Sequence, residues 1–460
     1  MPLLTALTEW IIPFLIAISI LIAVHEWGHY RMAVACGVKV LRFSIGFGTP
    51  IARFKPKKQR PGQDTEFVIS LIPIGGYVKM LDAREGEVPE DERHLAFDAQ
   101  PLKSRALIVA AGPVANLLLA VLLFAAVNWI GQLEPRAVLA APVAGSLADK
   151  AGLQGGELVR AAALDGQEAQ PVRSFENLRW LLIRGAVDGQ DVLLQLERAG
   201  GGTREVTLPL AALPSREPNP ELFHAIGIEP LMQPQIGELV PGGPAERAGL
   251  QTGDVVRMVG QVHITGAEQL IDLIRASVVD GQPQASLWEV ERAGRRLTLQ
   301  VLPRVDGQRG RIDAGLVNAP PEMALVRYGP IEGLTAGVLK VWDVSALSLR
   351  LLGRMVVGQL SVKNLSGPVA IADYAGKAAH MGLVTFIGFL AFISVSLGVF
   401  NLLPVPVLDG GQLVYFLWEA VTGKPVTGAW LDRLQYVGLS LLLAIMAIAM
   451  YNDISTRWPF

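Results

Sequence analysis

The chain has 460 residues, of which 51% are hydrophobic and 18% are charged. Soluble domains carry about a quarter charged residues, so this composition and a mean hydropathy of +0.38 argue against a purely soluble protein. The apolar content excludes disorder, and a net charge of −2 implies no general attraction to nucleic acid. The single cysteine, Cys36, excludes an internal disulfide framework and a cysteine-rich metal site.

The first apolar segment extends from Trp10 to Cys36 and contains the polar run His25–His29. Residues 1–10 hold no Lys or Arg, and no small-residue cleavage site follows the apolar stretch. We therefore predict a retained membrane span and not a cleaved signal peptide. The following segment 31–103 holds twelve Lys and Arg, which predicts that this loop is cytoplasmic and that the N-terminus faces outward.

Within this first loop, Glu66–Met80 is predicted to form two strands around a turn at Pro73–Gly76. We interpret residues 37–104 as a membrane-associated β-hairpin region. A free strand edge there would pair with an extended peptide by strand addition. The alternative is an ordinary packed hairpin.

Three further uncharged runs are long enough to cross a bilayer, which takes about 17 to 25 residues. They are Ala106–Ile130, Met381–Leu403 and Leu434–Tyr451. The chain is therefore predicted to be a multi-pass α-helical membrane protein with four transmembrane helices. Alternation from the cytoplasmic loop places residues 131–380 outside, residues 404–433 inside and the C-terminus outside.

The exterior region contains an internal repeat. Ala148–Leu153 recurs 97 residues later as Ala245–Leu250, and each copy is followed by a glycine and an acid, Gly156–Glu157 and Gly253–Asp254. Copies of roughly 90 residues are the size of small domains and too large for solenoid repeats. We therefore predict two exterior α/β modules.

The repeated pattern resembles PDZ domains of the bacterial protease type, which places PDZ-like modules at residues 132–225 and 226–305. Such domains bind extended peptides by strand addition. The alternative is a pair of duplicated spacer domains without a ligand. The sequence does not identify the groove-lining residues.

A segment with mixed charges on an apolar background, residues 333–360, follows the modules. It is predicted to be an amphipathic helix lying at the membrane surface, or else a helix packed on the second module.

The predicted order along the chain is a first transmembrane helix (1–36), the cytoplasmic β region (37–104), a second transmembrane helix (105–131), the two PDZ-like modules (132–225 and 226–305), a connector with the amphipathic helix (306–380), a third transmembrane helix with the motif Leu-Asp-Gly (381–411), a cytoplasmic loop (412–433), and the fourth transmembrane helix with the tail (434–460).

The run His25-Glu26-Trp27-Gly28-His29 matches the pattern HExxH. Positions i and i+4 of a helix lie on one face, so the two imidazoles can share a metal ion, while Glu26 can reach a water bound to it. The alternative is a buried polar cluster in a helix bundle. Ionisable groups inside a membrane helix are costly and are functional by default, which favours the metal site.

Zinc in hydrolytic sites takes three protein ligands and leaves one position open for water. Asp409, just past the third apolar run, is the predicted third ligand, because the other histidines lie in loops or exterior modules. Prolines 404 and 406 interrupt the helix there, and irregular backbone at membrane depth is tolerated where it lines a cavity. The alternative is that Asp409 is a polar helix end. The ligand set suits zinc but does not exclude another divalent metal.

The motif HEWGH on the first span, together with NLLPVPVLDGG at the third, resembles the site-2 protease family of intramembrane zinc metalloproteases. Nearly the whole chain resembles the bacterial four-span members with tandem PDZ domains, the sigma-E-regulating type. Four further segments match that group: Arg42–Gly48, Ile74–Met80, Ala111–Asn116 and Lys363–Pro368.

The resemblance implies that His25, His29 and Asp409 bind zinc and that Glu26 is the general base. It implies hydrolysis of peptide bonds within transmembrane segments of trimmed single-span proteins, especially anti-sigma factors, and of remnant signal peptides. The expected location is the bacterial inner membrane with both termini and the PDZ-like modules in the periplasm. The expected partners are these substrates and membrane lipid, with no nucleic acid.

A substrate helix must unwind before its carbonyls can be attacked, because they are hydrogen-bonded. Asn401 resembles the family's substrate-contacting asparagine; the alternative is a helix-capping or bundle residue. Gly75, Gly76 and Tyr77 of the predicted hairpin are candidates for holding the opened strand.

The two alternatives to an enzyme are a membrane-anchored scaffold and a metal transporter. A membrane-anchored PDZ scaffold with a structural metal would normally close its zinc with four ligands and carry no adjacent base, and here three ligands and a glutamate are found. A metal transporter would need polar residues spread along the spans, and the second and fourth offer few. The sequence favours the enzyme.

Overall fold

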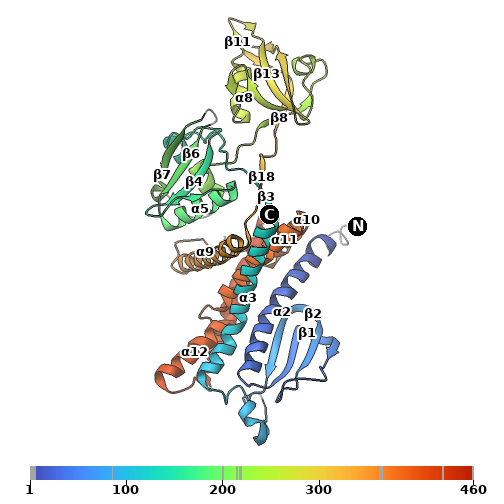
Figure 1. The fold of residues 1–460 in the computed structure, drawn as a ribbon, viewed down its shortest axis with the longest axis vertical. Coiled ribbons are helices and arrows are strands. Elements are labelled where there is room, and N and C mark those ends of the chain that lie inside the picture. Colours follow the sequence, from blue (N-terminus) through green and yellow to red (C-terminus); the bar gives the residue numbers. More distant parts are fainter. Residues whose placement is uncertain are drawn as a thin grey trace. The chain divides into compact units, whose positions relative to one another are not determined.

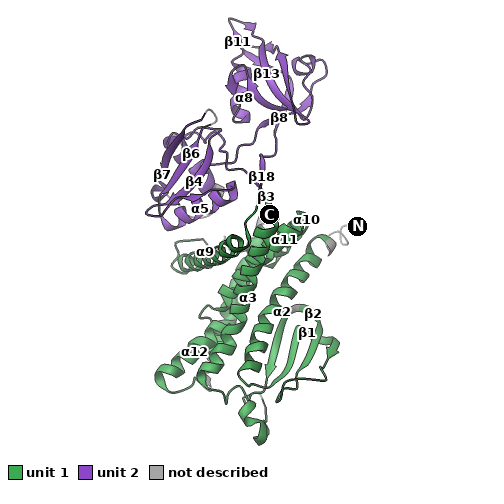
Figure 2. Ribbon diagram, in the orientation of Figure 1, with its two compact units in different colours: residues 1–132, 327–460 green, residues 133–326 purple. Residues whose placement is uncertain are grey.

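The computed structural model describes residues 7–84, 86–198, 201–213, 216, 220–361, 366–426 and 429–457. The chain divides into two compact units (Figure 2). Unit 1 consists of residues 1–132 and 327–460, and unit 2 consists of residues 133–326.

Among the residues that the structure describes, unit 1 contains 4 helices that are long and apolar enough to cross a membrane. They are α2 (Ile12–Ala35), which continues the π-helical turn η1 (Leu7–Ile11), α3 (Leu102–Ile130), α11 (Leu383–Asn401) and α13 (Ala429–Arg457). These helices coincide with the four apolar runs of the sequence, so the predicted spans are confirmed as helices.

Helix α3 is the centre of unit 1 and contacts α2, α9 (Pro330–Val356), α11 and α12 (Asp409–Thr422) (Figure 1). Three glycines on its neighbours allow this packing. A Cβ atom on Gly28 of α2, Gly337 of α9 or Gly398 of α11 would lie 2.3, 2.9 or 3.0 Å from a carbonyl oxygen of α3. Small residues at such positions let membrane helices approach closely.

The β region is built from β1 (Val40–Phe54) and β2 (Glu66–Met80), which pair with each other and contact α2. The predicted turn lies inside β2, which is one strand and not two. Ile45 of β1 nevertheless pairs with both Ile69 and Gly76, so the two halves of β2 flank the same part of β1. The positive φ of 116° at Gly75 permits the reversal, because glycine adopts such values without strain.

Helix α9 belongs to unit 1 and packs on α3 and α11. These contacts do not support the alternative of a helix packed on the second module, and the placement at the membrane surface stays a prediction. Helix α10 (Pro368–His380) is capped from α13, because Asp453 accepts hydrogen bonds from the backbone N–H groups of Gly367 and Ala370, each 2.9 Å long. Residues 363–365 of the segment that matched the family lie outside the described residues.

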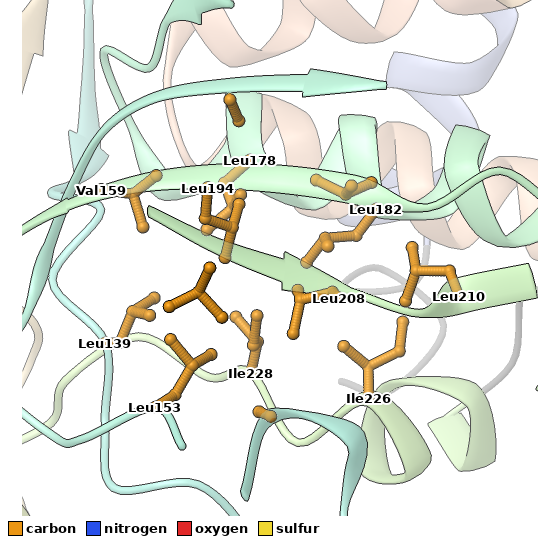
Figure 3. Close-up of a cluster of buried hydrophobic side chains, with 14 of the residues drawn as sticks. Leu139, Leu153, Val159, Leu178, Leu182, Leu194, Leu208, Leu210, Ile226 and Ile228 are labelled. Carbon is orange, nitrogen blue, oxygen red and sulfur yellow. The ribbon is translucent and has the colours of Figure 1, made fainter. Parts of the chain in front are cut away.

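Unit 2 holds two α/β modules, each with its own hydrophobic core. The first has the sheet order β5-β4-β6-β7. Its elements are α4 (Leu147–Lys150), β4 (Leu158–Leu164), β5 (Gln170–Pro171), α5 (Phe175–Asp188), β6 (Val192–Glu197), β7 (Thr203–Leu208) and α6 (Pro220–Ile226). Figure 3 shows Leu178 and Leu182 of α5 packed against Leu194 and Leu208 of the sheet.

The second module has the sheet order β14-β13-β9-β8-β17. Its main elements are β8 (Pro234–Leu239), α7 (Pro244–Arg247), β9 (Val255–Val259), α8 (Ala267–Arg275), β13 (Ser286–Arg292), β14 (Arg295–Val301) and β17 (Ala314–Asn318). The sheet thus extends past residue 305, the predicted end of the module, because β17 pairs with β8. The sequence repeat did not reveal this strand, since it was recognised from the opening motif of each copy.

The repeated motif has the same structural role in both modules. Gly152 and Gly249, which follow short helices, have positive φ values of 74° and 82°, and the leucine after each is buried. The repeated acids are buried ion-pair partners: Glu157 meets the Arg204 guanidinium at 2.7 and 2.8 Å, and Asp254 meets that of Arg292 at 2.7 Å through both oxygens. The identity of these modules as PDZ domains stays a prediction.

Candidate metal centre

His25 and His29 lie one turn apart on α2, and both are buried. Their Nε2 atoms are 3.1 Å apart. The i, i+4 spacing therefore directs both nitrogens to one point, as the HExxH pattern predicted.

Asp409 is the first residue of α12 and completes the cluster. Its Oδ2 lies 3.1 Å from Nε2 of His25 and 3.5 Å from Nε2 of His29. The loop before Asp409 packs tightly against the first turn of α12. A Cβ added to Gly410 or Gly411 would lie only 2.3 or 2.2 Å from a carbonyl oxygen of that loop. The two glycines of the motif thus allow Asp409 to reach the histidines.

The three atoms fit a zinc ion. Ligands about 2.0–2.1 Å from a tetrahedral zinc lie roughly 3.3 Å from one another, and the observed separations are 3.1, 3.1 and 3.5 Å. Oδ2 of Asp409 is buried, and no described residue forms a hydrogen bond with it. A buried carboxylate oxygen that faces two imidazole nitrogens is suited to a shared cation.

Residues of α3 contact the imidazole rings of the two histidines. Nδ1 of His29 donates a hydrogen bond to the carbonyl oxygen of Ile108 at 2.9 Å. With its proton on Nδ1, the ring presents an unprotonated Nε2 to the metal. Gly112, one turn further along α3, leaves room for the site, because a Cβ there would lie 2.3 Å from Nε2 of His29 and 2.9 Å from Cε1 of His25.

Glu26 is adjacent to the ligands and faces the β region. A Cβ on Gly76 would lie 3.0 Å from Cγ of Glu26 and 2.9 Å from a side-chain methyl of Ile22. The second half of β2 therefore passes directly beside the predicted base. Among the described residues, no strand pairs with the other edge of residues 76–80.

The other predicted substrate-binding residues lie around this point. A Cβ on Gly75 would overlap the ring of Phe47, which stacks on Tyr77 with 6.1 Å between ring centroids. Asn401 is the last residue of α11 and is partly exposed, and its amide makes no hydrogen bond within the described residues. The helix-capping alternative for Asn401 therefore has no support, and its substrate contact stays a prediction.

Gly112 and Asn116 also lie at the site, although their role there was not predicted from the sequence. Asn116 is fully buried, and its Nδ2 lies 3.2 Å from Nδ1 of His25. The available signal was an isolated asparagine within an apolar span, which is costly unless it has a partner.

Comparison with known proteins agrees with this geometry. A model of peptidase family M50 matches residues 13–445. A protein of Ralstonia nicotianae whose name assigns it to the zinc metalloproteases is 42% identical over 97% of this chain and 98% of its own length.

Two relatives carry more specific names. The regulator of sigma-E protease RseP of Escherichia coli is 35% identical over 96% of this chain and 97% of its own length. The regulator of sigma E protease of Haemophilus influenzae is 36% identical over the same shares, 96% and 97%. The chain therefore belongs to peptidase family M50, the site-2 protease family, and is a zinc metalloprotease.

Proposed function

We propose that this protease hydrolyses peptide bonds within the transmembrane segments of single-span proteins that have already been trimmed outside the membrane. The observation that carries the proposal is the position of His25, Glu26 and His29 within α2, a helix long and apolar enough to cross a membrane. A protease whose base and ligands lie at membrane depth acts on segments that enter the membrane.

The substrate class follows from the relatives. The Escherichia coli protein is named as a regulator of sigma-E protease, which supports anti-sigma factors as substrates and a role in envelope stress signalling. Remnant signal peptides have the same single-span form. We place the protein in the inner membrane, with unit 2 and both termini in the periplasm and the metal centre toward the cytoplasmic side, because residues 31–103 carry the Lys and Arg bias.

The residues divide the chemistry between them. His25, His29 and Asp409 would hold a zinc ion, which would supply Lewis acidity at neutral pH. Glu26 would accept a proton from the attacking water and return it to the leaving amine. A structural zinc site is normally closed by four protein ligands, and the described residues bring together three, so the non-enzymatic scaffold is not favoured.

The substrate must present an extended backbone at this point. Within the described part of the chain, residues 76–80 of β2 have an unpaired edge beside Glu26, and an opened substrate segment would add to it as a strand. The amide of Asn401, which makes no hydrogen bond with the described residues, would bond to that backbone. Gly75, Gly76 and Tyr77 would then hold the substrate next to the base.

Replacing Glu26 by Gln tests the proposal. Wild type and Glu26→Gln are reconstituted in liposomes with a single-span substrate whose exterior part has been removed, and the cleavage products are mapped by mass spectrometry. We expect cleavage inside the span by wild type and a loss of at least about 100-fold in the variant, with zinc content unchanged. Cleavage only outside the span would refute intramembrane proteolysis, and activity in a folded Glu26→Gln protein would remove Glu26 from the mechanism.

We further propose that unit 2 excludes substrates with bulky exterior parts. It is inserted between α3 and α9, the segments at either end of it, so both of its ends are tethered to unit 1. Replacing residues 133–326 by a short flexible linker is expected to permit cleavage of untrimmed substrates and to spare cleavage of trimmed ones. Loss of both activities with zinc still bound would indicate that the modules recruit substrates.

A further inference from the structure

The two metal-binding imidazoles are held differently at the nitrogen that points away from the metal. Nδ1 of His29 meets a backbone carbonyl, that of Ile108. Nδ1 of His25 meets a side chain, the amide of Asn116, whose nitrogen is placed 3.2 Å away. A backbone carbonyl can only accept a hydrogen bond, whereas an amide can accept or donate.

Ligation through Nε2 requires that the proton of a neutral imidazole reside on Nδ1. That N–H needs an acceptor, and in the present orientation the amide of Asn116 offers its NH2 group. The amide oxygen, Oδ1, is buried and has no hydrogen-bond partner among the described residues. The oxygen and nitrogen of an amide have nearly the same shape and are assigned from the hydrogen-bond network.

We infer that Oδ1 of Asn116 accepts a hydrogen bond from Nδ1–H of His25 when the metal is bound. A half-turn of the amide exchanges the two atoms, so that Oδ1 faces the imidazole. Asn116 is then a positioning residue: it holds His25 in the tautomer that leaves Nε2 unprotonated, and it fixes the plane of the ring. The role parallels that of Ile108 toward His29.

The surroundings of Asn116 suit this role. It is fully buried, and its backbone carbonyl accepts a hydrogen bond of 2.7 Å from Oγ of Ser394, which is also fully buried on α11. Ile108, Gly112 and Asn116 occupy positions i, i+4 and i+8 of α3 and so lie along one face of that helix. Along this face, the carbonyl of Ile108 contacts His29, the missing side chain of Gly112 leaves room for both imidazoles, and the amide of Asn116 contacts His25.

Three variants of the full-length protein in detergent test the inference. Asn116→Leu keeps the approximate volume and removes the acceptor, Asn116→Asp keeps an acceptor oxygen, and Ser394→Ala removes a hydrogen bond to Asn116 without altering any group at His25. The measurements are the zinc dissociation constant from chelator competition, the visible absorption spectrum of the cobalt-substituted protein, and a thermal melt by circular dichroism. None of them uses a substrate, so failure here is distinct from failure of the proposed function.

We expect Asn116→Leu to weaken zinc binding by about 10–100-fold, the usual cost of losing a residue that orients a ligand, and to alter the cobalt spectrum. Asn116→Asp is expected to retain wild-type affinity, and Ser394→Ala is expected to leave affinity and spectrum unchanged. Wild-type affinity in a folded Asn116→Leu protein would overturn the inference, as would an equal loss in Asn116→Leu and Asn116→Asp. If Asn116→Leu does not fold, Asn116→Ala carries the same expectation and the same refutation.

Discussion

Both units bury carboxylates, but they balance the buried charge in different ways. In unit 2, fully buried Asp254 accepts two hydrogen bonds of 2.7 Å from Arg292 and one of 2.8 Å from the backbone of Gln251. In the described part of unit 1, Oδ2 of Asp409 is buried with no hydrogen-bond partner and faces two imidazoles. A bidentate arginine completes the first site from within the chain, whereas the second has a donor set that a metal ion would complete.

In the first module, too, an arginine neutralises the buried carboxylate. Glu157 pairs with Arg204 at 2.7 and 2.8 Å and accepts a hydrogen bond of 2.8 Å from the backbone of Gln154. In both modules the arginine also donates to the carbonyl oxygen of the glycine in the repeated motif. A pairing that occurs twice in the same structural context indicates a role in folding. The arrangement at Asp409, by contrast, indicates a role in binding.

Removing Asp409 should have the largest effect. Asp409→Ala removes one of the three proposed ligands, so we expect zinc affinity to fall by more than the roughly 10–100-fold that the loss of a supporting residue costs, with loss of proteolysis. Metal analysis and chelator competition measure the first effect. Hydrogen exchange in unit 2 should be unaltered. Full zinc occupancy in the variant would mean that another residue is the third ligand.

Adding a methyl group at Gly112 should have a similar but smaller effect. The new Cβ in Gly112→Ala would lie 2.3 Å from Nε2 of His29, which requires the helix or the imidazole to move. We expect weaker zinc binding in the same chelator assay. Gly353→Ala on α9 is the matched control, because among the described residues no atom beyond its chain neighbours and the adjacent backbone of α9 lies within 4 Å of the added Cβ, and it should bind zinc as wild type does. Equal affinity in the two variants would contradict the close fit of α3 to the metal centre.

Neutralising Asp254 should affect unit 2 alone. Asp254→Asn leaves Arg292 without its counter-charge; breaking a fully buried pair costs roughly 3–5 kcal/mol, and we expect about 2 kcal/mol because the Arg292 side chain is 28% exposed. Hydrogen exchange of β9 and β13 in the full-length protein should quicken. Glu157→Gln should do the same for β4 and β7. A fall in zinc affinity in either variant would contradict the separation of the two roles.

Acidification gives the smallest and most local effect. Burial raises the pKa of Asp254, but the hydrogen bonds from Arg292 and from the Gln251 backbone lower it, and the net direction is below the ordinary value. The stabilisation is therefore present above the unfolded-state pKa, near 3.9, and is lost as the pH falls through the lower folded-state pKa. Exchange rates of β9 and β13, corrected for intrinsic rates, should rise below about pH 4 in wild type. The same acid dependence in Asp254→Asn would assign it to another group.

Features that depend on local pattern were correctly inferred from the sequence. The four long apolar helices follow from uninterrupted apolar length, and the meeting of His25 with His29 follows from helical spacing. The repeat located both glycine turns and both buried acids. These features depend on residues close together in the chain, so the order of residues suffices to predict them.

Other features depend on contacts that no local pattern records. Asn116 and His25 are 91 positions apart, and only the packing of α3 on α2 brings them together. The repeat in the sequence identified Glu157 and Asp254 but not the arginines that pair with them. The predicted second module ended before β17. For the segment that forms α9, the sequence was compatible with two different placements. The third ligand is intermediate: the sequence proposed Asp409 from its motif, but the loop closure that brings Oδ2 to the two imidazoles is a property of the folded chain. Sequence spacing fixes which side chains share a helix face or a turn, whereas the partner of a buried polar group is decided by which surfaces exclude water together.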